Sequence, residues 1–336
     1  MKKIGKQTYE FDNEINIVAG VSLVGNKEGE GPLKDYFDYV ESDDKMGEKT
    51  FEKGERKMFV KTISSLIKKS KVDKENIDLY VGGDLMNQLV SSNYAAEQLR
   101  IPFLGLYNAC ATMTESLIVG STFLDSNGVQ TVICATGSHF SSAERQYRYP
   151  LEFGNQRQSY AQWTVTGVGA TLLSTKHKSS VKIKKVTIGK VADYGVVDIA
   201  NMGAAMAPAA METLCAFFND TKTTQKDYDL IATGDLGKLG SDIFKDLMME
   251  KGYLLETNYI DCGHTIFNIE QDTLQGGSGA GCSAVVFNSY ILKKLQEGDF
   301  KRVLLISTGA LMSTTTNQQG DSIPCIAHLV MMEVDK

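Results

Sequence analysis

The feature that most constrains the fold of this chain is an internal repeat. Three elements occur twice in the same order: an apolar run ending in Gly-Asp-Leu, a Cys that begins a helical stretch, and a closing apolar run. They lie at 78–85, Cys110 and 163–174, and again at 229–236, Cys282 and 323–334. Cys110 and Cys282 are 172 residues apart, and so are Gly137 and Gly309, which end the strands after the two helical stretches. Such regular spacing indicates a duplicated structural unit.

Strand-like and helical segments alternate within each copy. In the first copy the apolar patterns predict the order β-α-β-α-β-α-β-β, at residues 15–24, 50–70, 77–83, 86–99, 102–106, 111–126, 130–136 and 163–174. Alternation of this kind predicts a mainly parallel sheet covered by helices. We therefore expect an α/β chain with an N-terminal half over 1–178 and a C-terminal half over 179–336.

Composition and charge exclude several classes of function. The formal net charge is −6 and no run of Lys and Arg could follow a phosphate backbone, so nucleic acid is not an expected partner. The apolar stretch 15–24 is short and contains glycine, and we expect neither a signal peptide nor a transmembrane segment. The six Cys show no C-x-x-C and no metal-like spacing to the four His. We expect free thiols, no metal and no cofactor.

Two further patterns carry structural predictions. The Lys-rich stretch 176–185 is typical of a solvated turn followed by an edge strand. Glycines at 167–169 and 276–281 do not form a dinucleotide-binding motif, and we expect them where the backbones of the two halves pack closely.

Cys110 carries the strongest functional signal. The short strand at 102–106 runs through Tyr-Asn-Ala into Cys110, and a helix follows. Backbone N–H groups and the helix dipole at such a position favour a thiolate, as in a nucleophile or a ligand-binding group. The alternative is a small, buried and inert cysteine, and the local sequence does not decide between the two.

A duplicated chain with strand-loop-Cys-helix in its first half resembles the thiolase and ketoacyl-synthase-III superfamily, whose nucleophile occupies this position. That resemblance implies a thiolase-like fold with a five-layered αβαβα core. From about residue 4 to the end, the chain is also similar to the stage V sporulation AD family of endospore-forming bacteria. The segments that carry this similarity are Gly5–Thr8, Gly31–Leu33, Gly83–Gln88, Ser138–Pro150 and Met202–Ala210.

The family resemblance implies a function and a setting. It implies binding of dipicolinic acid (pyridine-2,6-dicarboxylic acid), free or as its calcium chelate, for uptake into spores and release at germination. The implied partners are the other stage V sporulation A proteins, through which the chain would be peripheral on the inner membrane of the spore or forespore. Thiolase-like folds usually pair through an edge of the first-half sheet, so a homodimer is expected as well.

The second-half loops argue against catalysis. A condensing enzyme needs a His, with an Asn, a second His or a second Cys, to accept protons and hold an oxyanion. The loops that should carry them, at 234–237, 276–281 and 308–311, contain none of these, and Asp235 stands where a His is expected. His264 lies about a dozen residues before the glycine loop. We expect a non-catalytic protein; a Cys110-dependent acyltransferase or condensing enzyme and a purely structural platform are the alternatives.

A ligand site is expected beside Cys110. The segment after strand 130–136 should lie over the pocket, and its Arg residues match carboxylates with charge-assisted hydrogen bonds of about 1.5–3 kcal/mol each. The alternative for these Arg residues is a structural ion pair with Glu144 or Glu152. Aromatic residues near them could stack on a ring. The expected ligand-binding residues are Asp84, Asn87, Cys110, His139, Ser142, Arg145 and Arg148.

Overall fold

The two halves of the chain have the same strand order. The computed structural model describes residues 1–147 and 157–335. The first half contributes β2 (Thr8–Gly25), β4 (Leu79–Gly83), β5 (Phe103–Gly105), β6 (Thr131–Ser138) and β8 (Gly167–Ser174). The second contributes β9 (Val181–Thr187), β10 (Leu230–Thr233), β11 (Tyr259–Asp261), β13 (Arg302–Ala310) and β14 (Cys325–Val334). The order is β5-β4-β6-β8-β2 in one half and β11-β10-β13-β14-β9 in the other.

Strand directions repeat as well. In the first half, β4 is parallel to β5 and β6, and β8 is antiparallel to β6 and β2. In the second half, β10 is parallel to β11 and β13, and β14 is antiparallel to β13 and β9. Pairing of β2 with β9 joins the two halves into one continuous sheet. The chain passes from the first half to the second between Ser174 and Val181. The division of the chain at residue 178 stays a prediction.

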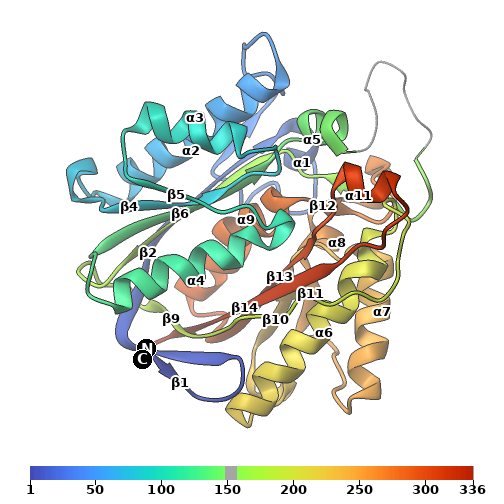
Figure 1. Ribbon diagram of the computed structural model, residues 1–336. Helices are drawn as coiled ribbons and strands as arrows, with labels where there is room; N and C mark the ends of the chain where they lie inside the picture. The colour runs from blue at the N-terminus through green and yellow to red at the C-terminus, as the bar shows by residue number, and fades with distance from the viewer. Residues whose placement is uncertain (148–156, 336) are drawn as a thin grey trace.

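Helices form three layers around these strands (Figure 1). The outer face of the first half carries α2 (Phe51–Ser70) and α3 (Val90–Leu99), and that of the second carries α6 (Met202–Thr221) and α7 (Gly237–Glu250). Between the two halves of the sheet lie α4 (Thr112–Asp125) and α9 (Ala280–Val286), which continues through a π-helical turn into α10 (Leu292–Glu297). The central core takes buried residues from both halves. The five-layered αβαβα arrangement expected from the sequence is confirmed.

Local sequence explains the predicted helix at 50–70. The Thr50 side chain accepts a hydrogen bond from the backbone N–H of Lys53, which caps the first turn, and the helix ends where Lys71 adopts a left-handed conformation. Met58, Phe59, Ile63 and Leu66 lie on one face and are fully buried against the first sheet. Burial of each stabilises the fold by roughly 1.5–3 kcal/mol.

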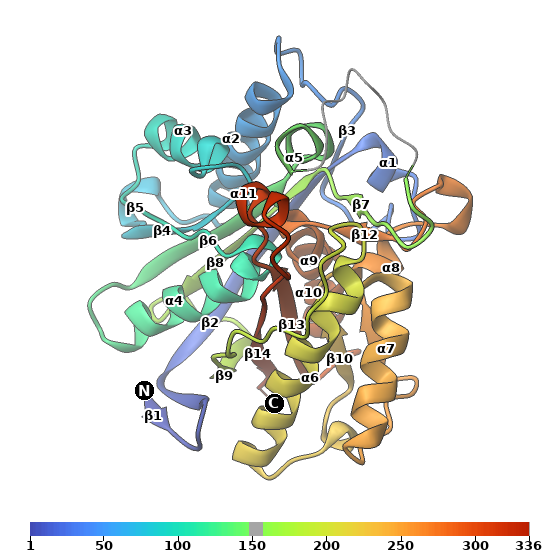
Figure 2. The same ribbon diagram turned by 45° about the vertical axis from the view of Figure 1, so that its right-hand side comes forward.

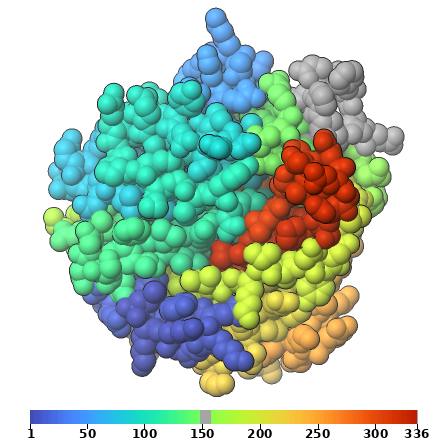
Figure 3. Space-filling view, in the orientation of Figure 1, coloured from blue at the N-terminus to red at the C-terminus, as the bar shows by residue number. Residues whose placement is uncertain are grey.

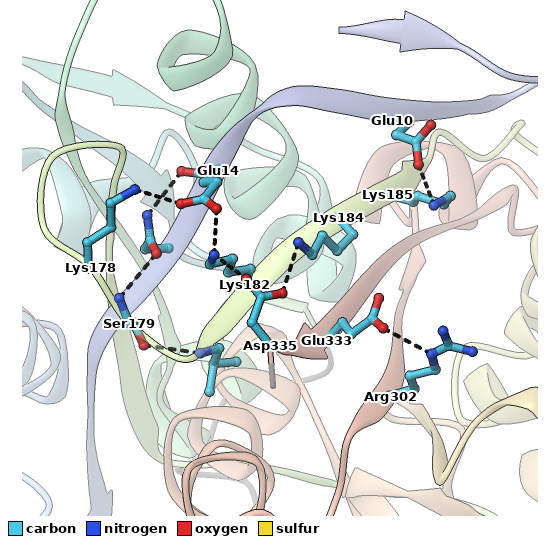
Figure 4. Close-up of polar contacts among 12 residues, drawn as sticks. Glu10, Glu14, Lys178, Ser179, Lys182, Lys184, Lys185, Arg302, Glu333 and Asp335 are labelled. Carbon is cyan, nitrogen blue, oxygen red and sulfur yellow. Dashed lines mark hydrogen bonds and ion pairs between the residues drawn. The ribbon is translucent and has the colours of Figure 1, made fainter.

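The prediction for the Lys-rich stretch is confirmed for the turn, where Lys176 and Lys178 are exposed, but wrong for the strand that follows. Strand β9 is not an edge strand, because it pairs with β14 on one side and β2 on the other. Acidic side chains on β2 and just after β14 pair with four of the lysines (Figure 4). The pairs are Lys178 and Lys182 with Glu14, Lys182 and Lys184 with Asp335, and Lys185 with Glu10. Four of the five lysines of this stretch are therefore paired with three carboxylates of the same chain.

Close packing of the halves requires glycine where the sequence predicted it. A Cβ atom added at Gly169 would lie 2.2 Å from the carbonyl oxygen of Ala284 on α9. A Cβ atom added at Gly281, in the second glycine run, would lie 2.4 Å from the carbonyl oxygen of Gly167. The expectation of close backbone contact is confirmed at both places. Within the residues described, no helix is long and apolar enough to cross a membrane.

Candidate functional site

A cavity of about 220 Å³ lies at the boundary of the two halves, with Cys110 in its wall. It is lined by the Cys110 loop, by α5 (Phe140–Tyr147), by the strands β7 (Trp163–Thr164) and β12 (Gly277–Ser278), by the start of α6 and by residues 310–312. The surface of this last segment, red in Figure 3, lies against cyan first-half and yellow second-half surfaces. The volume is below the roughly 300–1,000 Å³ typical of drug-sized ligands, so a small molecule fits best.

The lining of the cavity is mainly apolar. Tyr107 and Tyr147 contribute rings, and Met202 and Met312 contribute thioethers. The hydroxyls of the two tyrosines lie 2.6 Å apart, and Tyr147 also donates to the backbone carbonyl of Leu85. Among the described lining residues none carries a charged side chain.

The loop before α4 holds Cys110 in a constrained position. Ala109 has a φ of +48°, a left-handed conformation that costs an L-residue roughly 1–2 kcal/mol. The Thr112 hydroxyl donates to the Ala109 carbonyl (2.7 Å) and accepts from the backbone N–H of Asn108 (3.2 Å). Cys110 follows in a short 3-10 turn just before α4, with 7% of its surface exposed. The predicted strand-loop-Cys-helix arrangement is confirmed.

Asp235 is the immediate partner of the thiol. The Cys110 thiol donates to the Asp235 carboxylate, which also accepts from the Thr308 hydroxyl (2.7 Å) and the Gly279 backbone N–H (3.0 Å). Burial raises the pKa of Asp235 to about 6, against the opposing effect of these three hydrogen bonds. All three second-half loops therefore meet at Cys110, and the carboxyl group occupies the place where sequence reasoning expected a catalytic base.

A carboxylate with this pKa is a poor base for a thiol. Moving a proton from an ordinary thiol, of pKa about 8.5, to a carboxylate of pKa about 6 costs about 3 kcal/mol. An imidazole would gain an attractive ion pair with the thiolate, whereas an ionised Asp235 opposes a second negative charge beside it. Asp235 is therefore not a base that would readily take the Cys110 proton.

The histidines do not replace that base. His139 is buried, with Nε2 2.8 Å from the Asp44 carbonyl and Nδ1 accepting from the Ser141 backbone N–H. His264 is exposed. His328, which sequence reasoning did not single out, has Nε2 3.0 Å from the Asn108 amide nitrogen, and Nδ1 accepts from the Gly189 backbone N–H. Burial lowers the pKa of His328 to about 4, so its ring is neutral. Through Asn108 it stabilises the loop that carries Cys110. Its one signal was a lone His within the closing apolar run.

The residues predicted after β6 lie on the other side of α5 from the cavity. His139, Ser142 and Arg145 are spaced by three and face α2. The ring of His139 packs on Phe51, Ser142 faces the buried carboxyl of Glu55, and Arg145 pairs with Glu52 at 3.2 Å. Ala143 and Tyr147, spaced by four, face the cavity instead. The sequence did not predict a helix here, so the two faces of α5 could not be told apart.

The remaining predicted residues also lie away from the cavity lining. Asp84 is fully buried and accepts from the backbone N–H groups of Met86 (2.8 Å) and Ser92 (2.7 Å), which fixes the start of α3. Asn87 is exposed and its backbone N–H donates to Gln146 on α5. Arg148 lies outside the described residues. Of the described members of the predicted set, Cys110 alone lines the cavity, and ligand binding by the set stays a prediction.

Repeated five-stranded halves with a cysteine before a central helix define a thiolase-like protein. Human mitochondrial 3-ketoacyl-CoA thiolase in complex with CoA superposes with a TM-score of 0.62 and 11% identity, covering 98% of this chain and 100% of that one. The 3-oxoacyl-[acyl-carrier-protein] synthase III of Aquifex aeolicus VF5 gives 0.57 and 11%, over 95% and 99%. At such identities the likeness shows the fold alone.

The chain belongs to the stage V sporulation protein AD family, whose pattern its residues 5–333 match. Stage V sporulation protein AD of Bacillus subtilis (strain 168) is 43% identical over 333 residues, which are 99% of this chain and 98% of that protein. The family and the fold expected from the sequence are both confirmed, and the family supports a role in sporulation.

Proposed function

We propose that the chain is a non-catalytic subunit of the stage V sporulation A machinery and binds dipicolinic acid in the Cys110 cavity. The observation that carries the proposal is Asp235, bonded to the Cys110 thiol where a condensing enzyme needs a base. The fold and the cavity of an enzyme are kept, but the thiol is held as a hydrogen-bond donor. Such a site suits binding without turnover.

The cavity fits a small aromatic acid in size and chemistry. A ring can pack against the rings of Tyr107 and Tyr147 and the thioethers of Met202 and Met312, which all line the cavity. Thr164 and Ser278 line the same space and have hydroxyls that can donate to carboxylate oxygens. Since neutral donors bind carboxylates less strongly than cations do, we expect modest affinity.

The setting of this function follows from the family. We propose that the chain is peripheral on the inner membrane of the spore or forespore and is held there by the other stage V sporulation A proteins. A homodimer and binding of the calcium chelate belong to the same proposal. Co-purification from spore membranes with and without those partners tests the first point. Release of the chain into the soluble fraction when the partners are absent supports it, and retention contradicts it.

Calorimetry with dipicolinate tests the central claim. We expect saturable binding to the unmodified protein and loss of binding in Ala143→Phe, which fills the cavity from α5 without touching Asp235. Arg145→Gln is the matched control on the opposite face of the same helix, and we expect it to bind as the unmodified protein does. Absence of binding, or equal binding by Ala143→Phe, would refute the site.

The enzyme alternative has its own readout. Incubation with acetyl-CoA or a longer acyl-CoA, followed by intact-protein mass spectrometry, detects acylation of Cys110. The fold and the position of the thiol favour this alternative, whereas Asp235 opposes it. Acylation that disappears in Cys110→Ala would replace the proposal with a catalytic one.

A further inference from the structure

A buried carboxyl group that the Cys110 site does not use lies in the outer layer of the first half. Glu55, on α2, is fully buried, and among the described residues neither of its carboxyl oxygens has a hydrogen-bond partner of normal geometry. The same holds for the hydroxyls of Ser91 on α3 and Ser142 on α5. Figure 2 shows α3, α2 and α5 next to one another at one end of the molecule. Because buried polar groups are nearly always satisfied in folded proteins, this cluster is unusual.

No positive charge compensates an ionised Glu55. The neighbouring Asp84 accepts three hydrogen bonds, two from backbone N–H groups and one from the Ser92 hydroxyl at 2.6 Å, which is the environment of a carboxylate. Within the described residues no Lys, Arg or His forms an ion pair with either acid, and Arg145 pairs with Glu52 instead. Burial and the charge of Asp84 raise the pKa of Glu55 well above its ordinary value, against the opposing effect of the two serine hydroxyls. Burial raises the pKa of Asp84 as well, but its three hydrogen bonds oppose this. Of the two acids, Glu55 therefore holds the proton.

The other titratable groups at this interface keep their charge near neutral pH. On α5, His139 is neutral because burial lowers its pKa, and Arg145 is cationic. Tyr80 on β4 is fully buried, and burial raises its pKa. The strands β2 and β8 present apolar side chains to α2. Between about pH 6.5 and pH 9, Glu55 is therefore the described group whose charge can change between α2 and α5.

Of the two helices that contact Glu55 from outside α2, α5 is held less firmly. The start of α3 is fixed by the hydrogen bonds of Asp84, and its apolar side packs in the first-half core through Ala95, Ala96 and Leu99. On α5 the one buried apolar residue is Ala143, which faces the Cys110 cavity. The other buried residues of α5 are Ser141, Ser142 and Glu144. Since few apolar contacts hold α5 on α2, water can separate these two helices at low cost.

We propose that the proton on Glu55 is a switch that keeps the α5 wall of the Cys110 cavity closed. With the proton in place, α5 packs on α2, and Ala143 and Tyr147 stay in the cavity wall. Loss of the proton puts a second negative charge beside Asp84, so water enters between α2 and α5, and α5 moves away from the cavity. As control of ligand entry the switch rests on the proposed binding in the cavity, whereas the movement of α5 does not.

The direction of the pH dependence follows from linkage. The closed form holds the proton more tightly than the open form, in which Glu55 is in water and has its ordinary pKa of 4.5. Each pH unit above that value therefore favours the open form by up to about tenfold, until the raised pKa of the closed form is reached. The cavity is closed on the acid side and opens as the pH rises.

Amide hydrogen exchange measures the opening of α5 without any ligand. Between about pH 6.5 and pH 9, exchange in α5 should be faster in the unmodified protein than in Glu55→Gln, and the ratio of the two rates should grow with pH. The intrinsic pH dependence of exchange cancels in this ratio. Glu55→Met should behave as Glu55→Gln does, which guards against a folding defect in one variant. Glu48→Gln, which removes an acid paired with Lys57 before the start of α2, is the matched control and should exchange as the unmodified protein does.

Trp163 gives a second readout, because it is the one tryptophan of the chain and stacks on Phe140 of α5 with ring centroids 3.7 Å apart. Its emission should change over the same pH range in the unmodified protein and not in Glu55→Gln. A rate ratio that stays constant with pH, or that grows equally in α4, would overturn the inference.

Dipicolinate separates this switch from the proposed binding function. Its association rate, followed by stopped-flow fluorescence, should rise with pH in the unmodified protein and stay constant in Glu55→Gln. Opening of α5 in a protein that binds no dipicolinate would keep the switch and refute the binding proposal. Normal binding with a constant exchange ratio would refute the switch alone.

Discussion

Replacement of Asp235 by Asn is expected to change the pH dependence of stability. The folded-state pKa of Asp235 is about 6 and the ordinary Asp value is 3.8, a rise of about two units, or about 3 kcal/mol. Because the folded pKa is the higher one, the folded state holds the proton more tightly. Stability is therefore lost as the pH rises from about 4 to about 6, and the full cost is present above that window.

The amide introduced by Asp235→Asn would carry no charge, so that cost disappears at neutral pH. The amide can point its oxygen toward the Gly279 backbone N–H and its NH₂ group toward the Thr308 hydroxyl, which can accept, so neither contact is lost. We expect Asp235→Asn to be within about 1 kcal/mol of the unmodified protein in stability near pH 4.5 and more stable by up to about 3 kcal/mol at pH 7.

Urea unfolding at intervals between pH 4.5 and 7.5 measures this difference. Asp261, whose pKa burial also raises to about 6, titrates in the same window and remains in Asp235→Asn. The variant should therefore keep a part of the pH dependence, and Asp261→Asn should remove the other part. Identical pH profiles for Asp235→Asn and the unmodified protein would refute the claim that burial beside Cys110 raises the pKa of Asp235.

Three other perturbations probe the fold and the thiol. Cys110 should react with iodoacetamide at pH 7 at least about tenfold more slowly than free cysteine, because its thiol donates to Asp235. Asp235→His should speed this reaction, and an unchanged rate would contradict the hydrogen bond between Cys110 and Asp235. Gly169→Ala should destabilise by about 1–3 kcal/mol or more in urea unfolding, whereas Gly128→Ala, in an exposed turn, should not. Leu66→Ala should cost about 2–5 kcal/mol, and a cost below about 1 kcal/mol would mean that α2 is not packed as described.

The sequence predicted the fold because the information is local and repeated. Two copies of each strand-helix pattern at a constant offset leave few alternatives, and the direction and order of the strands follow from the doubled βαβ units. The position of Asp235 was also visible, since the end of β10 is marked by the Gly-Asp-Leu repeat. The pairing partners of β9 were not visible, because Glu14 and Asp335 reach Lys182 only through tertiary contacts.

The composition of the cavity could not be predicted for a similar reason. A charged, exposed-looking segment after β6 suggested a loop with ligand-binding residues, but it forms α5, and α2 takes the face with His139 and Arg145. The charges on that face are therefore used inside the protein. The residues of α5 that face the cavity are Ala143 and Tyr147. Nothing in the sequence marks them as ligand-binding residues unless the segment is first recognised as a helix.

The two repeat cysteines show how the duplication also shapes the site. Cys282, the second-half counterpart of Cys110, is fully buried and donates its S–H to the carbonyl of Gly234 at 3.4 Å. Cys110 donates to the side chain of the next residue, Asp235. The equivalent thiols of the two halves therefore bond to adjacent residues, Gly234 and Asp235, in the loop after β10. Because the counterpart thiol also bonds to this loop, the same kind of sulfur hydrogen bond gives Cys110 a structural role, which is to position Asp235 beside the cavity in which we propose that the ligand binds.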